Sequence, residues 1–81
     1  MAGDRLQALI AYIASSLVDD PDAVEVNVVE EDRAIVLELT VAPDDLGKVI
    51  GKEGRTARAM RTLLSATSAR MRKRAILDIL E

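Results

Sequence analysis

The sequence predicts an α+β fold in which three helices cover one face of a three-stranded mixed sheet, in the order α-β-β-α-α-β. Three observations support this prediction. Two segments space their apolar residues three and four apart, as amphipathic helices do. Three others read as short strands rich in Val, Ile and Leu, two of them with clear alternation. The last two strands are separated by enough residues for two helices, and a connection of that length returns the chain parallel.

The N-terminal segment predicts the first helix. Large apolar residues recur at helical spacing along it and would share one face: Leu6, Leu9, Ile10, Ile13 and Leu17. The helix should end at Asp19 and Asp20, because Pro21 keeps the residue before it out of the helical region.

The next two segments predict an antiparallel hairpin. Residues 23–29 alternate valines with polar residues, and residues 34–41 place four apolar side chains on one face. A polar turn, residues 30–33, joins them. On the opposite face we expect polar side chains to point to water, among them Glu25, Asn27 and Glu38.

The second half predicts two helices and a strand. Pro43 suits the start of a short helix that runs to about Ile50, and the acids Asp44 and Asp45 suit its positive end. A longer helix should run from Arg55 to about Arg70. Its buried stripe is expected to include Ala59 or Met60, Leu63 and Thr67, widened by Ala57 and Leu64. The basic run 70–74 suits the negative end of that helix, and residues 75–80 form the last strand.

Composition narrows the function classes. A chain of 81 residues, 49% of them hydrophobic and 31% charged, predicts one small globular domain over residues 1–81. It contains no cysteine and no histidine, which removes thiol nucleophiles and the commonest proton shuttle and metal ligand. We therefore expect a binding protein rather than an enzyme, with no metal and no cofactor. No segment resembles a secretory signal or reaches membrane-spanning length, so the expected compartment is the cytoplasm.

The charges are segregated along the chain. The formal net charge is −3, yet residues 48–74 hold nine of the eleven basic residues and one of the fourteen acidic ones. A basic region set against an acidic body is the pattern to expect of a protein that binds phosphates. Some of these arginines could instead pair with the acidic half of the chain.

Two glycines three residues apart, Gly51 and Gly54, interrupt the helical segments. Gly51 follows the short helix, where a left-handed residue is wanted. Gly54 opens the longer helix, where unpaired N–H groups attract anions and a missing side chain lets a phosphate come close. Lys52 adds a positive charge between them. The loop is therefore predicted to hold a sugar-phosphate backbone, with arginines continuing along the helix after it: Arg55, Arg58 and Arg61.

Other glycine-rich loops do not fit these residues. A P-loop needs four residues between its first glycine and the Gly-Lys pair, whereas three separate Gly47 from Gly51. A helix also precedes the loop, which excludes a Rossmann motif. The stretch "GKVIGKEGR" instead resembles the V-I-G-x-x-G signature of KH domains, in their type II arrangement with the extra helix and strand first. The resemblance covers almost the whole chain. Among KH proteins, the chain is similar to the KhpA family of small bacterial RNA-binding proteins.

This resemblance implies single-stranded RNA as the ligand, with the GxxG loop clamping the backbone of about four nucleotides. It also implies self-association as a homodimer or pairing with a KhpB (Jag/EloR)-type KH protein. The resemblance further implies an RNA chaperone role linked to cell elongation and peptidoglycan homeostasis. Glu53, an acid in a basic loop, is expected to weaken RNA affinity. The candidate RNA-binding residues are Lys48, Val49, Ile50, Gly51, Lys52, Glu53, Gly54, Arg55, Arg58 and Arg61.

Two alternatives stay open beside RNA binding. Two helices joined by a glycine turn also describe a DNA-binding helix-turn-helix, although the arginines here alternate with alanines and strands flank the pair. The chain could also be an interaction module that dimerises and binds little RNA, through Ala8, Ala11 and Ser15 or through the Ala57, Leu64 and Ala66 side of the long helix. RNA-binding folds that stack bases on sheet aromatics are excluded, because Tyr12 is the single aromatic residue.

Overall fold

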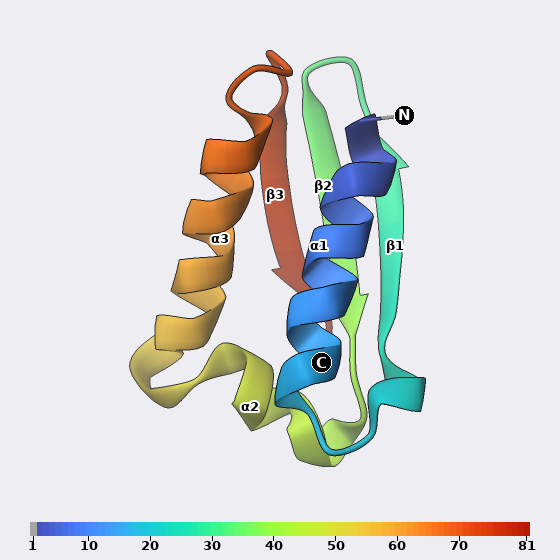
Figure 1. Ribbon diagram of the computed structural model, residues 1–81, viewed down its shortest axis with the longest axis vertical. Helices are drawn as coiled ribbons and strands as arrows, with labels where there is room; N and C mark the ends of the chain where they lie inside the picture. The colour runs from blue at the N-terminus through green and yellow to red at the C-terminus, as the bar shows by residue number, and fades with distance from the viewer. Residues whose placement is uncertain (1) are drawn as a thin grey trace.

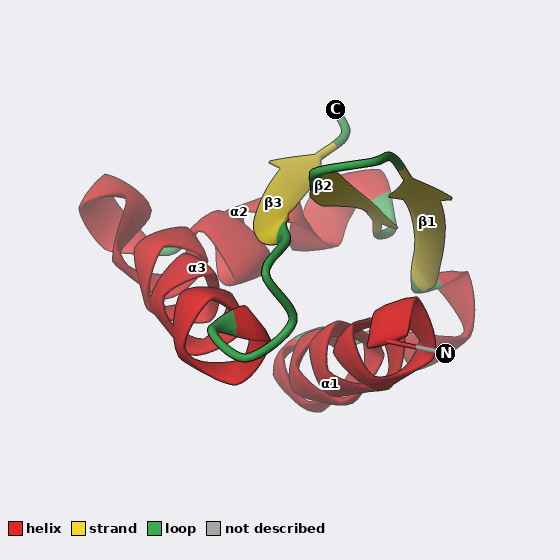
Figure 2. Cartoon of the chain, turned by 90° about the horizontal axis from the view of Figure 1, so that it is seen from above, coloured by secondary structure: helices red, strands yellow, loops and turns green. Residues whose placement is uncertain are grey.

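The computed structural model describes residues 2–81 and has the α+β architecture that the sequence predicts (Figure 1). In chain order the helices and strands are α1 (Ala2–Leu17), β1 (Glu25–Glu30), β2 (Ala34–Thr40), α2 (Leu46–Ile50), α3 (Arg55–Ser68) and β3 (Arg74–Ile79). Seen from above, the sheet forms one layer, and α1 and α3 lie side by side against one of its faces (Figure 2). The order and the layers are those of a type II KH fold.

The sheet is mixed, as expected. Strands β1 and β2 pair antiparallel with Val28 opposite Leu37, and β2 pairs parallel with β3, which places Leu77 beside Leu37. The strand order β1-β2-β3 follows the chain order. The connection through α2 and α3 therefore returns the chain to the sheet next to the strand it left.

The core lies between the sheet and the two longer helices. Strand β2 is central and contributes three fully buried side chains, those of Ile35, Leu37 and Leu39. Helix α1 adds Leu6, Ile10 and Ala14, which are spaced four residues apart and form its buried face. Leu17, the last residue of α1, was expected on this stripe, but it is 40% exposed.

Helix α3 is rotated relative to the sequence prediction. Its buried residues are Ala57, Met60, Leu64 and Ser68, which confirms three of the expected positions. Of the alternatives Ala59 and Met60, Met60 is the buried one; the expectation was wrong for Leu63 and Thr67, which lie on the exposed side. Apolar and small residues occur on several sides of this helix, so spacing alone did not fix its rotation; packing against the sheet did.

Three short 3₁₀ segments refine the predicted boundaries: Pro21–Ala23, Pro43–Asp45 and Lys52–Gly54. The first includes Ala23, so β1 begins at Glu25 instead of residue 23. The second takes the first turn of the predicted short helix. Helix α3 ends at Ser68, two residues earlier than predicted, and most of the basic run lies in the loop to β3, where Arg72 has a positive φ of 57°.

The two ends of the molecule differ in what they carry. The loop with Gly51 and Gly54 joins α2 to α3 at one end, and the β1–β2 turn and the α3–β3 loop lie together at the other (Figure 1). Helix α3 runs between these ends beside β3. Within residues 2–81 none of the helices is long and apolar enough to cross a membrane.

Candidate nucleic-acid interface

The loop between α2 and α3 owes its shape to backbone conformations that few residues adopt. Three of its four residues have positive φ angles: 78° at Gly51, 59° at Glu53 and 75° at Gly54. Gly51 donates its N–H to the carbonyl of Gly47 at 2.8 Å, and Gly54 donates to the carbonyl of Gly51 at 3.1 Å. These hydrogen bonds close a tight turn between α2 and α3. Gly54 is the N-cap of α3, as predicted.

The two glycines serve different purposes. With φ 78° and ψ 170°, Gly51 is not in the left-handed helical region that the sequence suggested, but in a region open essentially to glycine alone. A Cβ there would lie 2.2 Å from Oγ1 of Thr56 and 2.8 Å from its backbone nitrogen. A Cβ on Gly54 would meet nothing within 4 Å. Gly51 is needed by the fold, whereas Gly54 leaves open space in front of the start of α3.

The charged side chains of the loop are exposed, and some already bind each other. Arg55 Nη2 lies 3.5 Å from Glu53 Oε2, and Arg58 Nη2 donates to the backbone carbonyl of Glu53 at 3.3 Å. Within residues 2–81, Lys52 has neither an ion pair nor a side-chain hydrogen bond. These four residues form one charged surface at the start of α3, where the helix N-terminus favours anions.

The three candidates that precede the loop are placed differently. Val49, a candidate RNA-binding residue, is fully buried in the core, so its side chain is not available to a ligand. Ile50 is half-buried and lies next to the loop. Lys48 points to the acidic end of α1, with its Nζ 3.2 Å from Asp19 Oδ2 and 3.2 Å from Asp45 Oδ1. Its amine is held by protein carboxylates instead of facing the loop.

Asp45 anchors α2 to the rest of the molecule. It was expected to serve the helix dipole as a surface charge, but its side chain is buried and accepts hydrogen bonds from the N–H groups of Asp19 and Asp20, at 3.3 and 3.0 Å. Burial acts to raise the pKa of the Asp45 carboxyl, but these hydrogen bonds and the Lys48 amine outweigh it and hold the pKa below 3.8. The ion pairs with Asp19 and then Asp45 raise the pKa of Lys48 above 10.5.

We expect the Asp45→Asn variant to show a weaker acid dependence of stability. Because the folded pKa of Asp45 is lowered, its carboxylate stabilises the fold above pH 3.8 and this contribution is lost as the pH falls through the folded pKa. The variant should be less stable than the wild type at neutral pH, with the difference shrinking at about pH 3. Urea denaturation at both pH values measures this. Asp44→Asn provides the control, since it removes an exposed carboxylate from the same turn and should change the stability at neutral pH little. A constant difference for Asp45→Asn would contradict the assignment.

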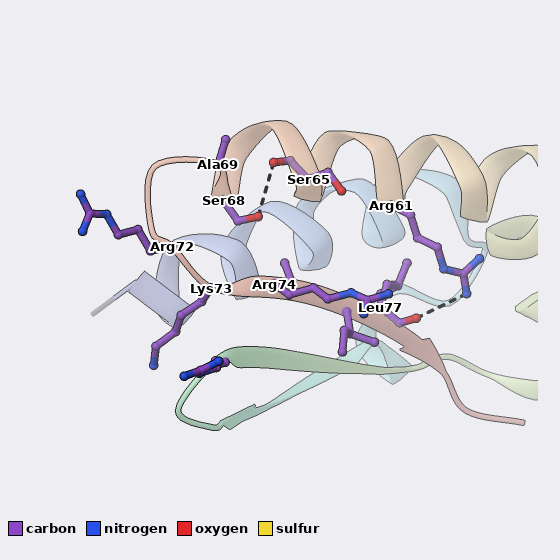
Figure 3. A pocket seen from close by; sticks show the side chains of 11 residues that line it. Arg61, Ser65, Ser68, Ala69, Arg72, Lys73, Arg74 and Leu77 are labelled. Atoms are coloured by element: carbon purple, nitrogen blue, oxygen red, sulfur yellow. Dashed lines mark hydrogen bonds between the residues drawn. The ribbon is translucent and has the colours of Figure 1, made fainter.

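A groove of about 670 Å³ lies between α3 and β3 (Figure 3). Its apolar lining residues include Ala75 and Leu77 from β3. Its rim is strongly basic, and within residues 2–81 no acidic side chain lines it. The basic lining residues are Arg33, Arg61, Arg72, Lys73 and Arg74. Of the candidates predicted from the sequence, only Arg61 lies in this groove; the others gather at the loop or, for Lys48 and Val49, beneath it.

Four basic residues of the groove were not among the predicted candidates. Arg72, Lys73 and Arg74 belong to the basic run that the sequence analysis assigned to a helix end. The run was therefore visible in the sequence, but its position in the groove could not be predicted from it. Arg33 comes from the β1–β2 turn, and its carbonyl accepts the N–H of Arg74 at 3.0 Å. Nothing local marks Arg33, because it reaches the groove only through the pairing of β2 with β3.

The open face of the sheet has the opposite charge. Glu38 and Asp78 lie side by side on β2 and β3, and Asn27 Nδ2 donates to Glu38 Oε1 at 3.0 Å. Phosphates are repelled from this face and attracted to the groove. Within residues 2–81 no three acidic side chains come close enough together to hold a metal ion.

Comparison with known proteins identifies the family. A family model described as KhpA/KhpB, KH domain, matches residues 7–79. The chain is 53% identical over 72 residues to an RNA-binding protein KhpA of Caldanaerobacter subterraneus subsp. tengcongensis, covering 89% of this chain and 96% of that protein. It is 48% identical over 75 residues to an RNA-binding protein KhpA of Clostridium acetobutylicum, covering 93% and 100%. It is also 47% identical over 76 residues to an RNA-binding protein KhpA of Aquifex aeolicus, covering 94% and 96%. The GxxG loop, the basic groove and these relatives agree, and the chain belongs to the KhpA/KhpB family of KH domains.

Proposed function

We propose that residues 1–81 act as one KH domain that binds single-stranded RNA, without catalysing a reaction, and that the GxxG loop clamps the RNA backbone. The observation that carries this proposal is the bare backbone at Gly54, where nothing within 4 Å occupies the space of a side chain at the start of α3. A phosphate can approach the helix N-terminus there, with Lys52 and Arg55 on either side. Comparable relatives are named RNA-binding proteins.

The position of the groove supports a path for the RNA beyond the GxxG loop. Helix α3 leads from the GxxG loop along the groove to the basic α3–β3 loop (Figure 1). A sugar-phosphate backbone that starts at the loop would therefore meet further cations, with its bases against the apolar lining residues. Tyr12, the single aromatic residue, lies on α1 and does not line the groove. Without aromatic stacking we expect modest affinity.

The wider biology remains a prediction from the resemblance. We propose the cytoplasm as the compartment because RNA is the proposed ligand, and a homodimer or a complex with a KhpB-type KH protein as the assembly. Leu63, which is 48% exposed on α3, gives a dimer an apolar contact point. An RNA chaperone role linked to cell elongation and the cell wall stays part of the same prediction.

The test is the binding of a labelled single-stranded RNA of mixed sequence to the wild type and to the double variant Lys52→Asp/Glu53→Asp. Aspartate tolerates the positive φ of 59° at position 53, so the loop should keep its shape while losing its positive charge. Binding should weaken with salt, with a log-log slope of about −0.7 per phosphate contacted, and the variant should show a smaller slope and lower affinity.

Two controls separate the alternatives. Equal thermal stability of the two proteins shows that the loop change acts on binding and not on folding. A DNA duplex of the same sequence tests the helix-turn-helix alternative, which tighter duplex binding would favour. Equal RNA binding by both proteins would contradict the clamp, and a wild type that binds no RNA but dimerises would make the chain an interaction module.

A further inference from the structure

The open face of the sheet carries a row of apolar side chains. Val29 of β1, Val36 of β2 and Ile76 of β3 are neighbours in the strand register, and none of them belongs to the core. Val29 and Ile76 are 41% and 37% exposed. Both long helices lie against the other face, and within residues 2–81 no helix packs over this row (Figure 2). A contiguous exposed apolar row marks an interaction surface, which scattered apolar residues do not.

Charges of opposite sign stand on either side of this row on β3. Arg74 lies two residues before Ile76, and Asp78 lies two residues after it. Across the register, Arg74 is next to Ala34, and Asp78 is next to Glu38. Within residues 2–81, neither Arg74 nor Asp78 makes an ion pair or a side-chain hydrogen bond. The two are four residues apart on an extended strand, about 13 Å, so they cannot pair with each other.

This pattern is complementary to a second copy of itself. If two such sheets pack face to face about a twofold axis that runs along the apolar row, their strands run in opposite directions. The apolar row then meets the apolar row, and Arg74 meets Asp78 of the partner subunit on both sides of the axis. A twofold axis parallel to the strands would instead set Glu38 against Glu38 of the partner subunit, which like-charge repulsion disfavours.

We propose that the open face of the sheet is a dimerisation surface for a second copy of this chain, with the apolar row on the twofold axis and two Arg74–Asp78 ion pairs between the copies. The inference rests on the homodimer of the proposed function, to which it assigns an interface, but not on RNA binding. The surface is separate from Leu63 on α3 and from the GxxG loop. Because β3 lies over β3 of the partner subunit in this dimer, both α3–β3 grooves open along the same edge.

The first experiment measures self-association without RNA. Three strands about 4.8 Å apart give a face smaller than a standard protein interface, so the dimer should be weak. Sedimentation equilibrium of the wild type from about 10 µM to 1 mM should show monomer and dimer. Ile76→Lys places like charges on the axis and should abolish the dimer over this range. Leu63→Lys, a comparably exposed change on the helical layer, is the control and should keep it.

An exchange of charges tests the proposed ion pairs. Arg74→Asp or Asp78→Arg alone sets like charges against each other and should raise the dissociation constant about 3- to 10-fold. The double variant Arg74→Asp/Asp78→Arg restores both pairs with reversed sign, so its dissociation constant should return to within about twofold of the wild-type value. Since the two positions cannot reach each other within one chain, such a recovery arises only between copies. All three variants change exposed positions and should fold normally.

A chemical cross-link locates the axis. The chain contains no cysteine, so Val36→Cys introduces a single thiol. On the axis this thiol lies opposite its counterpart, across sheets about 10 Å apart. Thr40→Cys lies on the same strand and face with similar exposure, but more than about 25 Å from its counterpart. A short bismaleimide should therefore convert Val36→Cys to a covalent dimer and leave Thr40→Cys monomeric.

The possible failures are distinguishable. A wild type that stays monomeric up to about 1 mM overturns the inference, while RNA binding is decided separately by the loop variant. A dimer that Leu63→Lys abolishes and Ile76→Lys keeps uses the helical layer, which also overturns it. So does a double charge variant that associates no better than the single ones, or equal cross-linking of the two cysteine variants.

Discussion

Replacement of Gly51 by alanine is expected to destabilise the protein by about 3 kcal/mol, the upper part of the range for a residue forced into a sparsely populated conformation. Two effects act together. The backbone at φ 78° and ψ 170° is strained for any L-residue, and the new Cβ would collide with Oγ1, Cβ and the backbone nitrogen of Thr56. The backbone nitrogen cannot move aside without disturbing the first turn of α3. Urea denaturation of the purified variant measures the loss.

The matched control is the second glycine of the loop. Gly54→Ala places its Cβ in open space, so it bears only the cost of a left-handed residue, about 1 to 2 kcal/mol. The expected order of stability is therefore wild type, Gly54→Ala, then Gly51→Ala. RNA affinity should show the opposite order, with the larger loss in Gly54→Ala, because its methyl group fills the space left for a phosphate. Equal destabilisation by the two substitutions would contradict the different roles assigned to them.

Replacement of Leu64 by alanine is expected to destabilise the protein by about 3 kcal/mol, within the range of 2–5 kcal/mol for buried leucines. Leu64 is fully buried on the face of α3 that packs against the sheet, and truncation leaves a cavity that a small core cannot close. A domain of this size has a total stability of only about 5–10 kcal/mol. The variant should consequently unfold at a much lower temperature than the wild type.

The neighbouring leucine supplies the control. Leu63 is 48% exposed, so Leu63→Ala should change the stability by about 0.5 kcal/mol or less. The pair thereby tests the rotation of α3, which the sequence alone placed incorrectly by including Leu63 in the buried stripe. Similar losses for the two variants would mean that α3 is rotated differently against the sheet. A change in the dimerisation of Leu63→Ala would instead mark its exposed side chain as a protein contact.

Asp45 connects the stability of the fold with the position of the loop. Its carboxylate binds the chain that leaves α1 and lies at the start of α2, whose last residue precedes Gly51. The loop is thus held from two sides, by α3 after it and by this buried anchor before it. Lys48 takes part in the anchor, which explains why a basic residue so near the loop is directed away from the proposed ligand.

The sequence by itself determined the order of the helices and strands, the β1–β2 hairpin and the break at Gly51 and Gly54. These features depend on residues close together in the chain. Alternation along 34–41 decides which side of β2 is buried, and a positive φ next to a helix end favours glycine. The candidates Lys52, Arg55 and Arg58 follow for the same reason, because their place at the start of a helix is fixed by local spacing.

Only the tertiary structure decided the rotation of α3 and the burial of Val49 and Asp45. It also decided the ion pairs of Lys48 and which residues line the groove. Each depends on residues that are distant in sequence: Arg61 meets Leu77 sixteen positions away, and Asp45 meets Asp20 twenty-five away. Arg33 lines the groove because β2 pairs with β3. Periodicity says that a helix has a buried side, but the facing surface decides which side that is, and hence which arginines reach the groove.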